Sequence, residues 1–599
     1  MEILYNKSKE VSPDETVKRV QSILEKVGIE NKYEYINSSV GTESVSLKSY
    51  LKGNLFISTN GKGIDKKLAL ASAYGEYMER FQNMFFINKN NKSLSNYLTY
   101  SELHEVFYYK TIDELLNQNV KFNILQQYKK DLSPNQFKAF IQVISYHDKD
   151  SDGKIPCVKA RDIIYNEEQY IPYRVAIWDT NGMSAGNTDY EALVQGMSEL
   201  LERKCQDKII INRINPPVIP EEYYEKFNVY KAIKSINSSE RYKIIVKDCS
   251  LNSWYPVVGV LFIDKERKYY KASFGSYPIF EIALERTITE LFQNVSIDKA
   301  AMVELYPYIN VVNNNKIQDN IFNMYLYGTA IIPEEFYRET DFSYEFKPFE
   351  EFDENVSNAE LYNYLVDKFK EEDYSVCVVN NTRLGFPAFK IITSDSLVMT
   401  TFSNYWEETY NSISVAESIK DDVNNFERID NQKALRFIQI IEPIFSSGSY
   451  LTFKYIVNKE IITNEGKMGS EYYYSLFLAL AYLKIGNKIK ALNYIKNIEK
   501  NIKEVYDNKV YEKFRCFTDI LMYFSSGTPV GLILDVVSNF YPQDLIKEAF
   551  EATFSYEKAI EYFGFFKPEG DLYIYNDEYE EELKRITRTL LLNNQTGGN

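Results

Sequence analysis

Apolar and polar residues follow two different patterns along the chain, and the change falls near residue 425. Before it, apolar runs of strand type alternate with stretches of helical period, as at Leu55–Thr59, Val175–Trp178 and Val257–Ile263. From about Asp430 the helical period persists through KALRFIQIIEPIF and SEYYYSLFLALAYLKIGNKIKALNYIKNIEKN. The pattern predicts an α+β domain over residues 1–425, followed by an all-α domain over residues 426–599.

One stretch of the helical part has the order of a helix, a tight turn and a second helix. Its small and aromatic residues are Ala481, Tyr482, Gly486, Ala491 and Tyr494. This spacing is typical of a tetratricopeptide-type helical pair. Small residues are also common at helix crossings, so a plain helical bundle remains the alternative.

The first part of the chain contains an internal repeat of strand, glycine-containing turn and helix. Its three copies read LFISTNGKGIDKKLALASAYGEYMERF, VAIWDTNGMSAGNTDYEALVQGMSELLERK and YYKASFGSYPIFEIALERTITELFQN. When the copies are aligned on Glu76, Glu199 and Glu290, polar residues recur four positions earlier and three positions later. The residues four positions earlier are Ser72, Gln195 and Arg286. The residues three positions later are Glu79, Glu202 and Gln293.

This spacing places the polar residues of each helix on one face. Glu191, Gln195, Glu199 and Glu202 fall at roughly 0°, 40°, 80° and 20° around a helix axis. The other faces are apolar, which indicates helices buried on most sides. A solvated acidic face with ordinary pairs one turn apart would explain any one helix. The same register on three helices favours one shared site.

The residue types indicate which ligand such a site would hold. Clustered glutamates repel one another unless cations neutralise them, and oxygen ligands without His or Cys select Mg²⁺ or Ca²⁺. Magnesium commonly joins carboxylates to phosphates, which points to a nucleotide. Five glutamates and ATP carry about −9, and Arg203, Arg286 and Lys9 return about +3, which leaves room for two or three Mg²⁺.

The turns of the repeat offer further candidates. Gly182 and Gly186 in TNGMSAGNT would let backbone N–H groups approach an anion. Thr188 and Glu191 have the spacing of a capping box, so a capping role is the alternative for Glu191. Lys62, between two glycines, is a weak signal by itself.

Charge and hydropathy exclude several classes of protein. Lys and Arg number 69 and Asp and Glu 85, a net charge of −16 over 599 residues. An acidic chain is a poor general binder of nucleic acid, so we expect no direct nucleic-acid contact. No apolar run approaches the length of a membrane span, and the N-terminal residues lack the order of a signal peptide. We therefore expect a cytoplasmic protein without a membrane contact.

The scarcity of two residue types excludes other chemistries. The five cysteines are far apart and form no CxxC pair, and there are two histidines. A zinc site, a redox motif or a histidine triad is not expected. Neither a GxSxG elbow nor a GxxxxGK[ST] phosphate loop occurs. The chemistry must rest on carboxylates, basic side chains, hydroxyls and backbone.

The segments NGKGIDKKLALASAYGEYMERF, NGMSAGNTDYEALVQGMSELLER and ALERTITELFQ resemble the YcaO superfamily. Its members bind ATP and Mg²⁺ in a site without a Walker motif and activate backbone amides. The resemblance covers residues 1–425, and the helical remainder resembles stand-alone members with a tetratricopeptide-like region. The resemblance implies that the Mg²⁺ ligands are Glu76, Glu79, Glu199, Glu202 and Glu290. It implies that the nucleotide contacts are Lys9, Thr16, Ser72, Ser184, Asn187, Glu191, Gln195, Arg203 and Arg286, the two arginines being also the catalytic candidates.

The chain departs from the family pattern in three places. Thr16 stands where serine is usual, which keeps the hydroxyl. Azoline-forming members often end in a proline-rich tail, whereas this chain ends in LLLNNQTGGN. A Pro-Gly step is also missing from the stretch Lys390–Ser396. The tail gives no support for heterocycle formation, and the altered stretch bears on substrate choice.

The resemblance implies an enzyme that activates a backbone amide of a peptide or protein substrate by phosphoryl or nucleotidyl transfer from ATP. Whether the chain turns over ATP alone is left open. An alternative is an accessory factor for β-methylthiolation of a small-subunit ribosomal protein, with a methylthiotransferase or that ribosomal protein as partner. A nucleotide-dependent scaffold without chemistry is a third possibility. We expect a homodimer assembled through the helical region.

Overall fold

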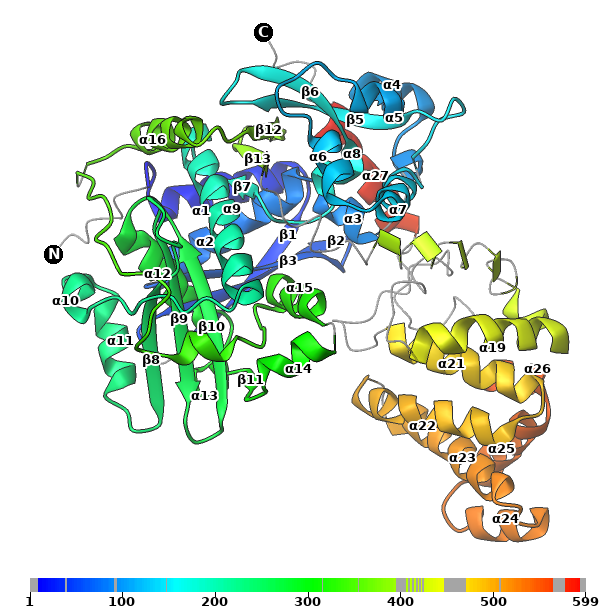
Figure 1. The fold of residues 1–599 in the computed structure, drawn as a ribbon. Coiled ribbons are helices and arrows are strands. Elements are labelled where there is room, and N and C mark those ends of the chain that lie inside the picture. Colours follow the sequence, from blue (N-terminus) through cyan, green and yellow to red (C-terminus); the bar gives the residue numbers. More distant parts are fainter. Residues whose placement is uncertain are drawn as a thin grey trace. The chain divides into compact units, whose positions relative to one another are not determined.

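A computed structural model shows the fold of the chain (Figure 1). It describes residues 9–37, 40–90, 94–146, 148–314, 316–353, 355–394, short stretches within 406–422, and residues 425–446, 470–505, 508–563 and 577–592. The chain forms two compact units. The first unit comprises residues 1–137, 144–403 and 578–599, and the second comprises residues 138–143 and 404–577.

The first unit contains three antiparallel sheets. The first has the order β1 (Glu30–Asn37), β2 (Glu43–Leu51), β3 (Asn54–Gly63). The second has the order β4 (Tyr108–Lys110), β5 (Ile155–Asp162), β12 (Val376–Asn380), β13 (Ala388–Thr393), β7 (Met183–Ala185), with β6 (Glu167–Pro172) paired to β5. The third has the order β11 (Val303–Glu304), β10 (Tyr269–Ser276), β9 (Val257–Asp264), β8 (Tyr242–Asp248).

Three helices follow strands of the three sheets, and these helices carry the polar stripes. They are α2 (Lys66–Gln82) after β3, α9 (Asp189–Ile211) after β7 and α12 (Phe280–Leu291) after β10. The other α-helices among the described residues up to 394 are α1 (Pro13–Lys26), α3 (Phe85–Asn90), α4 (Tyr100–Val106), α5 (Ile112–Leu116), α6 (Ile124–Asp131), α7 (Pro134–Ser145), α8 (Tyr173–Ile177), α10 (Glu221–Tyr224), α11 (Tyr230–Asn237), α13 (Ile297–Ala300), α14 (Tyr308–Asn313), α15 (Ile317–Tyr327) and α16 (Asn358–Glu371). No helix in the described ranges is both long and apolar enough to cross a membrane.

The three stripe-bearing helices pack in a cycle. Helix α2 packs on β2 and β3 of its own sheet and also on β7 and β13. Helix α9 packs on β7 and β13 and also on β9 and β10, as Figure 1 shows. Helix α12 packs on β9 and β10 and also on β3. Each helix therefore contacts its own sheet and the sheet of the next repeat, and the three helices surround one interior.

Glycines on the strands allow this close packing. A Cβ atom on Gly61 of β3 would lie 2.0 Å from the carbonyl oxygen of Ala69 in α2. A Cβ atom on Gly275 of β10 would lie 2.4 Å from Thr287 Oγ1 and 2.8 Å from the Thr287 nitrogen in α12. Both helices lie directly against strand backbone, where no side chain fits.

The predicted strands are confirmed at two of the three runs named above. Leu55–Thr59 lies in β3 and Val257–Ile263 lies in β9. The prediction for Val175–Trp178 is wrong, because residues 173–177 form α8 and the strand of the second repeat is β7. All five residues of α8 are buried. A short run buried on every side shows no period that separates a helix from a strand.

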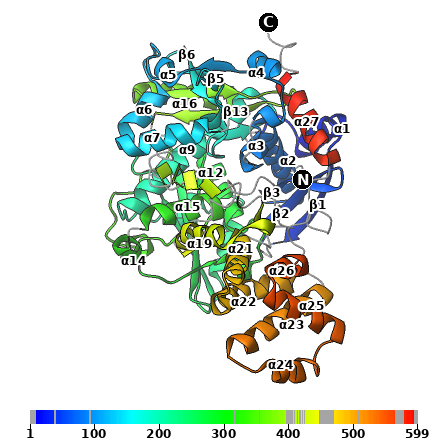
Figure 2. The ribbon, with the colours of Figure 1, turned by 90° about the vertical axis from the view of Figure 1, so that its right-hand side faces the viewer.

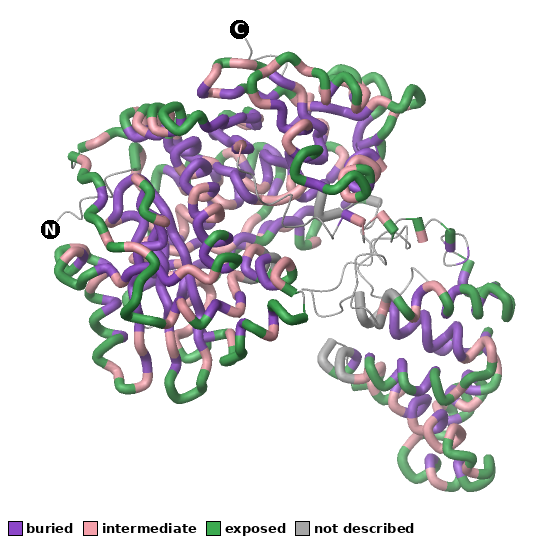
Figure 3. The backbone as a smooth tube through the Cα atoms, viewed as in Figure 1, coloured by how far each residue is buried: buried purple, intermediate pink, exposed green. Residues whose placement is uncertain are grey.

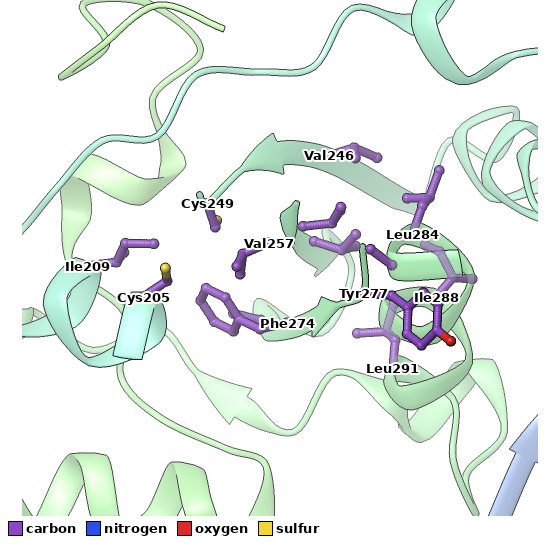
Figure 4. Packing of buried hydrophobic residues seen from close by; sticks show 14 of the residues in the cluster. Cys205, Ile209, Val246, Cys249, Val257, Phe274, Tyr277, Leu284, Ile288 and Leu291 are labelled. Atoms are coloured by element: carbon purple, nitrogen blue, oxygen red, sulfur yellow. The ribbon is translucent and has the colours of Figure 1, made fainter. Parts of the chain in front are cut away.

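The largest apolar core of the first unit lies between α9, α12 and the third sheet. Figure 3 shows the backbone of β8, β9 and β10 buried over most of its length. In Figure 4, Val257 and Phe274 lie between Cys205 on α9 and Leu284 on α12. This core fixes the spacing of two of the three stripe-bearing helices.

The second unit is helical throughout its described residues after 425. Its helices are α19 (Asn431–Ser446), α21 (Ser470–Lys484), α22 (Lys488–Val505), α23 (Asn508–Ser525), α24 (Val530–Val537), α25 (Gln543–Phe554) and α26 (Tyr556–Phe563). Gly486, with φ of 79°, makes the turn between α21 and α22. Tyr482 and Tyr494 stack across this pair at 5.8 Å and both donate to Glu442. The predicted α+β class with an all-helical region is confirmed, and the tetratricopeptide type stays a prediction.

The last helix, α27 (Asp577–Leu592), packs within the first unit. Arg585 donates to the Val27 carbonyl at the end of α1, and Arg383 donates to the Leu590 carbonyl. Figure 2 shows α27, in red, beside α1. Residues 578–599 therefore group with the first unit, unlike the rest of the predicted helical domain 426–599. The boundary at residue 425 stays a prediction.

Candidate functional site

The three polar stripes face one another inside the first unit. Arg286 of α12 donates to Gln195 Oε1 of α9, and Lys62 of β3 forms an ion pair with Glu290 of α12. The carboxylate of Glu79 on α2 is repelled by Glu199 on α9. The structure thus brings together residues from all three repeats, as the repeated register predicts.

Arginines of the same helices neutralise part of this carboxylate cluster. Arg80 lies 3.6 Å from both Glu76 Oε1 and Glu79 Oε1. Arg203 lies 3.8 Å from Glu199 Oε1. Arg80 was not among the predicted site residues, although EYMER and ELLER place an arginine four residues after the aligned glutamate in both repeats. Lys62 was noted as a weak signal, and the structure places it at Glu290.

Burial shifts the protonation equilibria in the cluster. It raises the pKa of Glu79 well above its ordinary value, and repulsion from Glu199 and Glu76 adds to this against the attraction of Arg80. Burial also raises the pKa of Glu202, against the attraction of Arg203 and Arg286. Burial and the neighbouring Arg286 lower the pKa of Lys62 to about 8. The carboxylates are therefore incompletely neutralised by the basic side chains around them.

Several buried polar atoms in the cluster have no hydrogen-bond partner among the described residues. They are Ser184 Oγ, Arg80 Nη1, Arg203 Nε and Arg286 Nε. Buried donors without a partner are rare in folded proteins. Three guanidinium groups and a hydroxyl with free donors fit an anionic ligand such as a phosphate chain.

The predicted metal ligands lie near one another but are not assembled around a common point. Among the residues that the structure describes, no three His, Cys, Asp or Glu side chains form a group that could hold a metal ion. Arg80, Arg203 and Lys62 occupy positions beside the carboxylates instead. The oxygen-only donor set fits Mg²⁺, and a bound cation would compete with these basic side chains.

A second group of predicted residues adjoins the cluster at the start of α9. Lys9 Nζ lies 2.5 Å from Glu191 Oε1, and Asn187 Nδ2 donates to Thr16 Oγ1 at 3.0 Å. Arg19, which sequence reasoning missed, donates to the carbonyl of Asn187 at 2.9 Å. Glu191 lies one turn before Gln195 on the same face of α9, so this group continues into the cluster. Ser72 lies one turn before Glu76 on α2.

The structure corrects the interpretation of Gly186 in the glycine turn. The N–H of Gly186 donates to the Pro387 carbonyl at 3.1 Å, so it is not free for an anion. Gly182 has φ of 73°, and a Cβ atom there would lie 2.3 Å from the carbonyl oxygen of Ile391. Both glycines serve the contact of this turn with the β13 region, where backbone lies against backbone.

The capping alternative for Glu191 is found in part. Thr188 caps α9 by accepting from the Glu191 nitrogen at 3.3 Å. The Glu191 carboxylate does not accept from the Thr188 nitrogen, as a capping box requires. It accepts from the nitrogen of Asn187 and from Lys9.

Residues 395 and 396 of the altered stretch, and the final residues 593–599, lie outside the described residues.

Two known proteins are similar to this chain in sequence. A protein of Haemophilus influenzae of uncharacterized function is 30% identical over 345 residues, which cover 56% of each chain. The ribosomal protein S12 methylthiotransferase accessory factor YcaO of Escherichia coli is 27% identical over 461 residues, 74% of this chain and 76% of that one. The match to the Haemophilus protein thus spans little more than half of its length.

Two solved structures are also similar. One is a heterocyclase in complex with substrate and cofactor, at a TM-score of 0.45 and 15% identity over 64% of this chain and 52% of that one. The other is YcaO from Methanopyrus kandleri bound with AMPPCP and Mg²⁺, at a TM-score of 0.39 and 16% identity over 67% and 95% of the two chains.

The chain also matches a whole family of proteins. Residues 60–395, more than half of the chain, match the YcaO cyclodehydratases, which are described as ATP- and Mg²⁺-binding. The polar stripes of all three repeats lie in this range. The chain is a member of the YcaO family.

Proposed function

We propose that this chain binds ATP with Mg²⁺ among the three stripe-bearing helices and uses it to activate a backbone amide of a peptide or protein substrate. ATP and Mg²⁺ are the cofactors described for the family. The observation that carries the proposal is the convergence of acidic stripes with buried, unpartnered arginine nitrogens. An acidic cluster alone would repel a nucleotide, whereas arginines with free donors give its phosphates a partner.

The residues divide into three roles under this proposal. Glu76, Glu79, Glu199, Glu202 and Glu290 hold Mg²⁺, and Arg203 and Arg286 contact phosphate oxygens. The remaining nucleotide contacts are Lys9, Thr16, Ser72, Ser184, Asn187, Glu191 and Gln195.

When bound, Mg-ATP supplies an electrophilic phosphoryl or nucleotidyl group that turns the amide oxygen into a leaving group. The chain's own contribution is electrostatic. Arg203 and Arg286 offset the negative charge of the phosphates. The apolar faces of α2, α9 and α12 keep bulk water from the site.

An accessory role is the second candidate. The Escherichia coli relative carries the name of a methylthiotransferase accessory factor and is similar over three quarters of both chains. Under this alternative the chain binds Mg-ATP and supports a methylthiotransferase that acts on a ribosomal protein. The helical second unit would then dock a partner or a second copy of the chain.

Nucleotide product analysis separates these candidates. Purified chain is incubated with Mg-ATP, alone and with a methylthiotransferase and its ribosomal protein target, and the products are resolved by chromatography. We expect ADP or AMP to form, and Arg203→Ala to abolish it. Arg213→Ala is the matched control, because Arg213 lies just beyond α9 and pairs with Glu334 and Glu335. Binding of ATP without turnover in any mixture would favour the accessory or scaffold role.

A further inference from the structure

The ring of Tyr325 lies against the guanidinium of Arg203. The Arg203 Cζ atom is 5.3 Å from the centroid of this ring. The Tyr325 hydroxyl donates to Asp207 Oδ2, and Asp207 lies one turn after Arg203 on α9. The arginine, the ring and the carboxyl group therefore form a closed set of contacts between α9 and α15.

Arg203 has few other contacts to fix its orientation. Its Nη1 donates to Gln206 at 3.2 Å, its Nη2 lies 3.8 Å from Glu199, and its Nε has no partner among the described residues. A long side chain held by distant contacts retains several rotamers. A planar ring against one face of the guanidinium restricts the orientation of the guanidinium plane. The N–H groups at the edge of the guanidinium remain free to donate.

The first repeat shows a similar arrangement. Arg80, at the equivalent position of α2, lies with its Cζ 5.7 Å from the centroid of Phe85 at the start of α3. Arg80 also has a buried nitrogen, Nη1, without a partner. Two arginines at matching positions thus rest on an aromatic ring from outside their own helix.

The tyrosine ring is itself held in place. Asp207 is 1% exposed, so its carboxyl group cannot exchange the hydroxyl for water. Burial raises the pKa of Asp207 to about 7, yet both protonation states can accept the hydroxyl bond. Helix α15 belongs to none of the three repeats and packs on α9.

We propose that Tyr325 and Asp207 are positioning residues that orient Arg203 for phosphate contact. The role of Arg203 rests on the proposed function, whereas its orientation by the ring can be tested without nucleotide. Tyr325 supplies the surface, and Asp207 fixes the ring through its hydroxyl. Neither side chain contacts the nucleotide itself.

The test uses the full chain and four variants. Tyr325→Leu removes the ring, Tyr325→Phe removes only the hydroxyl, and Asp207→Asn keeps an acceptor. Tyr308→Leu is the matched control. The Tyr308 ring likewise lies beside an arginine, with its centroid 5.8 Å from Arg213 Cζ, although it is fully buried whereas Tyr325 is half-buried. Its hydroxyl donates to the Ile210 carbonyl at the end of α9.

The first measurement is calorimetric titration with AMPPCP and Mg²⁺. We expect Tyr325→Leu to weaken binding about tenfold, the scale of a lost cation–π contact in a desolvated site. Tyr325→Phe and Asp207→Asn should weaken it about twofold, because the ring remains. Tyr308→Leu should bind as the wild type does. Equal affinity in Tyr325→Leu and Tyr308→Leu, whether reduced or unchanged, overturns the proposal.

The second measurement needs no nucleotide. The ¹⁵Nε–¹H signal of Arg203, assigned with an Arg203→Lys variant, should carry a ring-current shift that Tyr325→Leu removes and Tyr308→Leu leaves in place. An unchanged signal in Tyr325→Leu overturns the proposal. A wild-type chain that shows the shift but binds no AMPPCP would contradict the proposed function and leave the ring's orienting role supported.

Discussion

Glutamates of the interior site lie beside basic side chains of the same chain. Glu76 and Glu79 have Arg80, Glu199 has Arg203, and Glu290 has Lys62. A bound cation would replace part of this neutralisation, so the basic residues set how strongly the site depends on Mg²⁺. Removing one of them should make the cation more important to the stability of the fold.

Arg80→Leu tests this competition. The substitution leaves Glu76 and Glu79 without their basic neighbour and should lower the free energy of unfolding by about 1–3 kcal/mol. Added Mg²⁺ should then raise the melting temperature more in Arg80→Leu than in the wild type, as scanning calorimetry would show. Arg161→Leu is the control, because Arg161 is exposed and donates to Asn166. An equal rise of the melting temperature with Mg²⁺ in Arg80→Leu and in the wild type would show that Arg80 does not compete with the cation.

Asp207 gives a prediction of pH dependence. Burial raises the pKa of Asp207 from 3.8 to about 7 in the folded chain. The folded state therefore binds more protons than the unfolded state between these values, and stability is lost as pH rises through this window. Asp207→Asn removes the loss, so its melting temperature relative to the wild type should increase from pH 4 to pH 7 and then level off. A constant difference from pH 4 to pH 8 would contradict this reading of the carboxyl group.

Some residues of the interior site could be predicted from the sequence, and others could not. Lys9 and Thr16 are far from Asn187 and Glu191 along the chain, yet the family resemblance predicted all four and the structure brings them together. Arg80 was missed although its position in the repeat equals that of Arg203. Gly186 was misread, because a glycine needed for close backbone packing looks the same in sequence as one that exposes its N–H.

At the scale of elements, the repeat of strand and helix was predictable because each copy encodes its own turn and its own polar stripe. The order of the second sheet was not. Strands β12 and β13 insert between β5 and β7 from about 200 residues further along the chain. No local pattern encodes such a pairing, since periodicity shows only which face of a strand is buried. Helix α8 was mistaken for a strand because its residues are buried on every side and show no helical period.

Gly61→Ala tests whether close strand–helix packing is required. The added Cβ would meet the backbone of Ala69 and Ala73, which cannot move without shifting α2. We expect a loss of stability of about 2 kcal/mol or more, measured by urea unfolding. Gly75→Ala on α2 is the matched control, because nothing lies within 4 Å of its added Cβ. That variant should be stabilised by about 0.5–1 kcal/mol, and equal effects of the two would contradict the packing argument.

At the scale of the whole molecule, the chain has two cores that need not unfold together. The first unit includes residues 578–599 in addition to residues 1–137 and 144–403, so the chain returns to it after residue 577. Leu583 and Ile586 of α27 are fully buried. An amphipathic helix at the end of a helical region gives no signal in sequence for which core it joins.

Ligand-dependent melting should separate the two units. A nucleotide that binds the first unit alone raises only the transition of that unit. We expect Mg-AMPPCP to shift one of two calorimetric transitions, and Leu583→Asp to lower that same transition. Ile546→Asp, which changes a buried residue of α25 in the second unit, should lower the other. If Leu583→Asp lowers the transition that nucleotide does not shift, α27 is not part of the nucleotide-binding unit.

Calorimetric titration of the full chain with ATP, first with Mg²⁺ and then with excess chelator, tests the metal-bridged nucleotide site. The glutamates that converge from three polar stripes predict that binding requires Mg²⁺ and weakens strongly in Glu199→Gln and Glu290→Gln. Glu304→Gln on the exposed strand β11 serves as the control and should bind as the wild type does. Undiminished affinity for ATP in chelator, or equal affinity in all three variants, would contradict the metal-bridged nucleotide site.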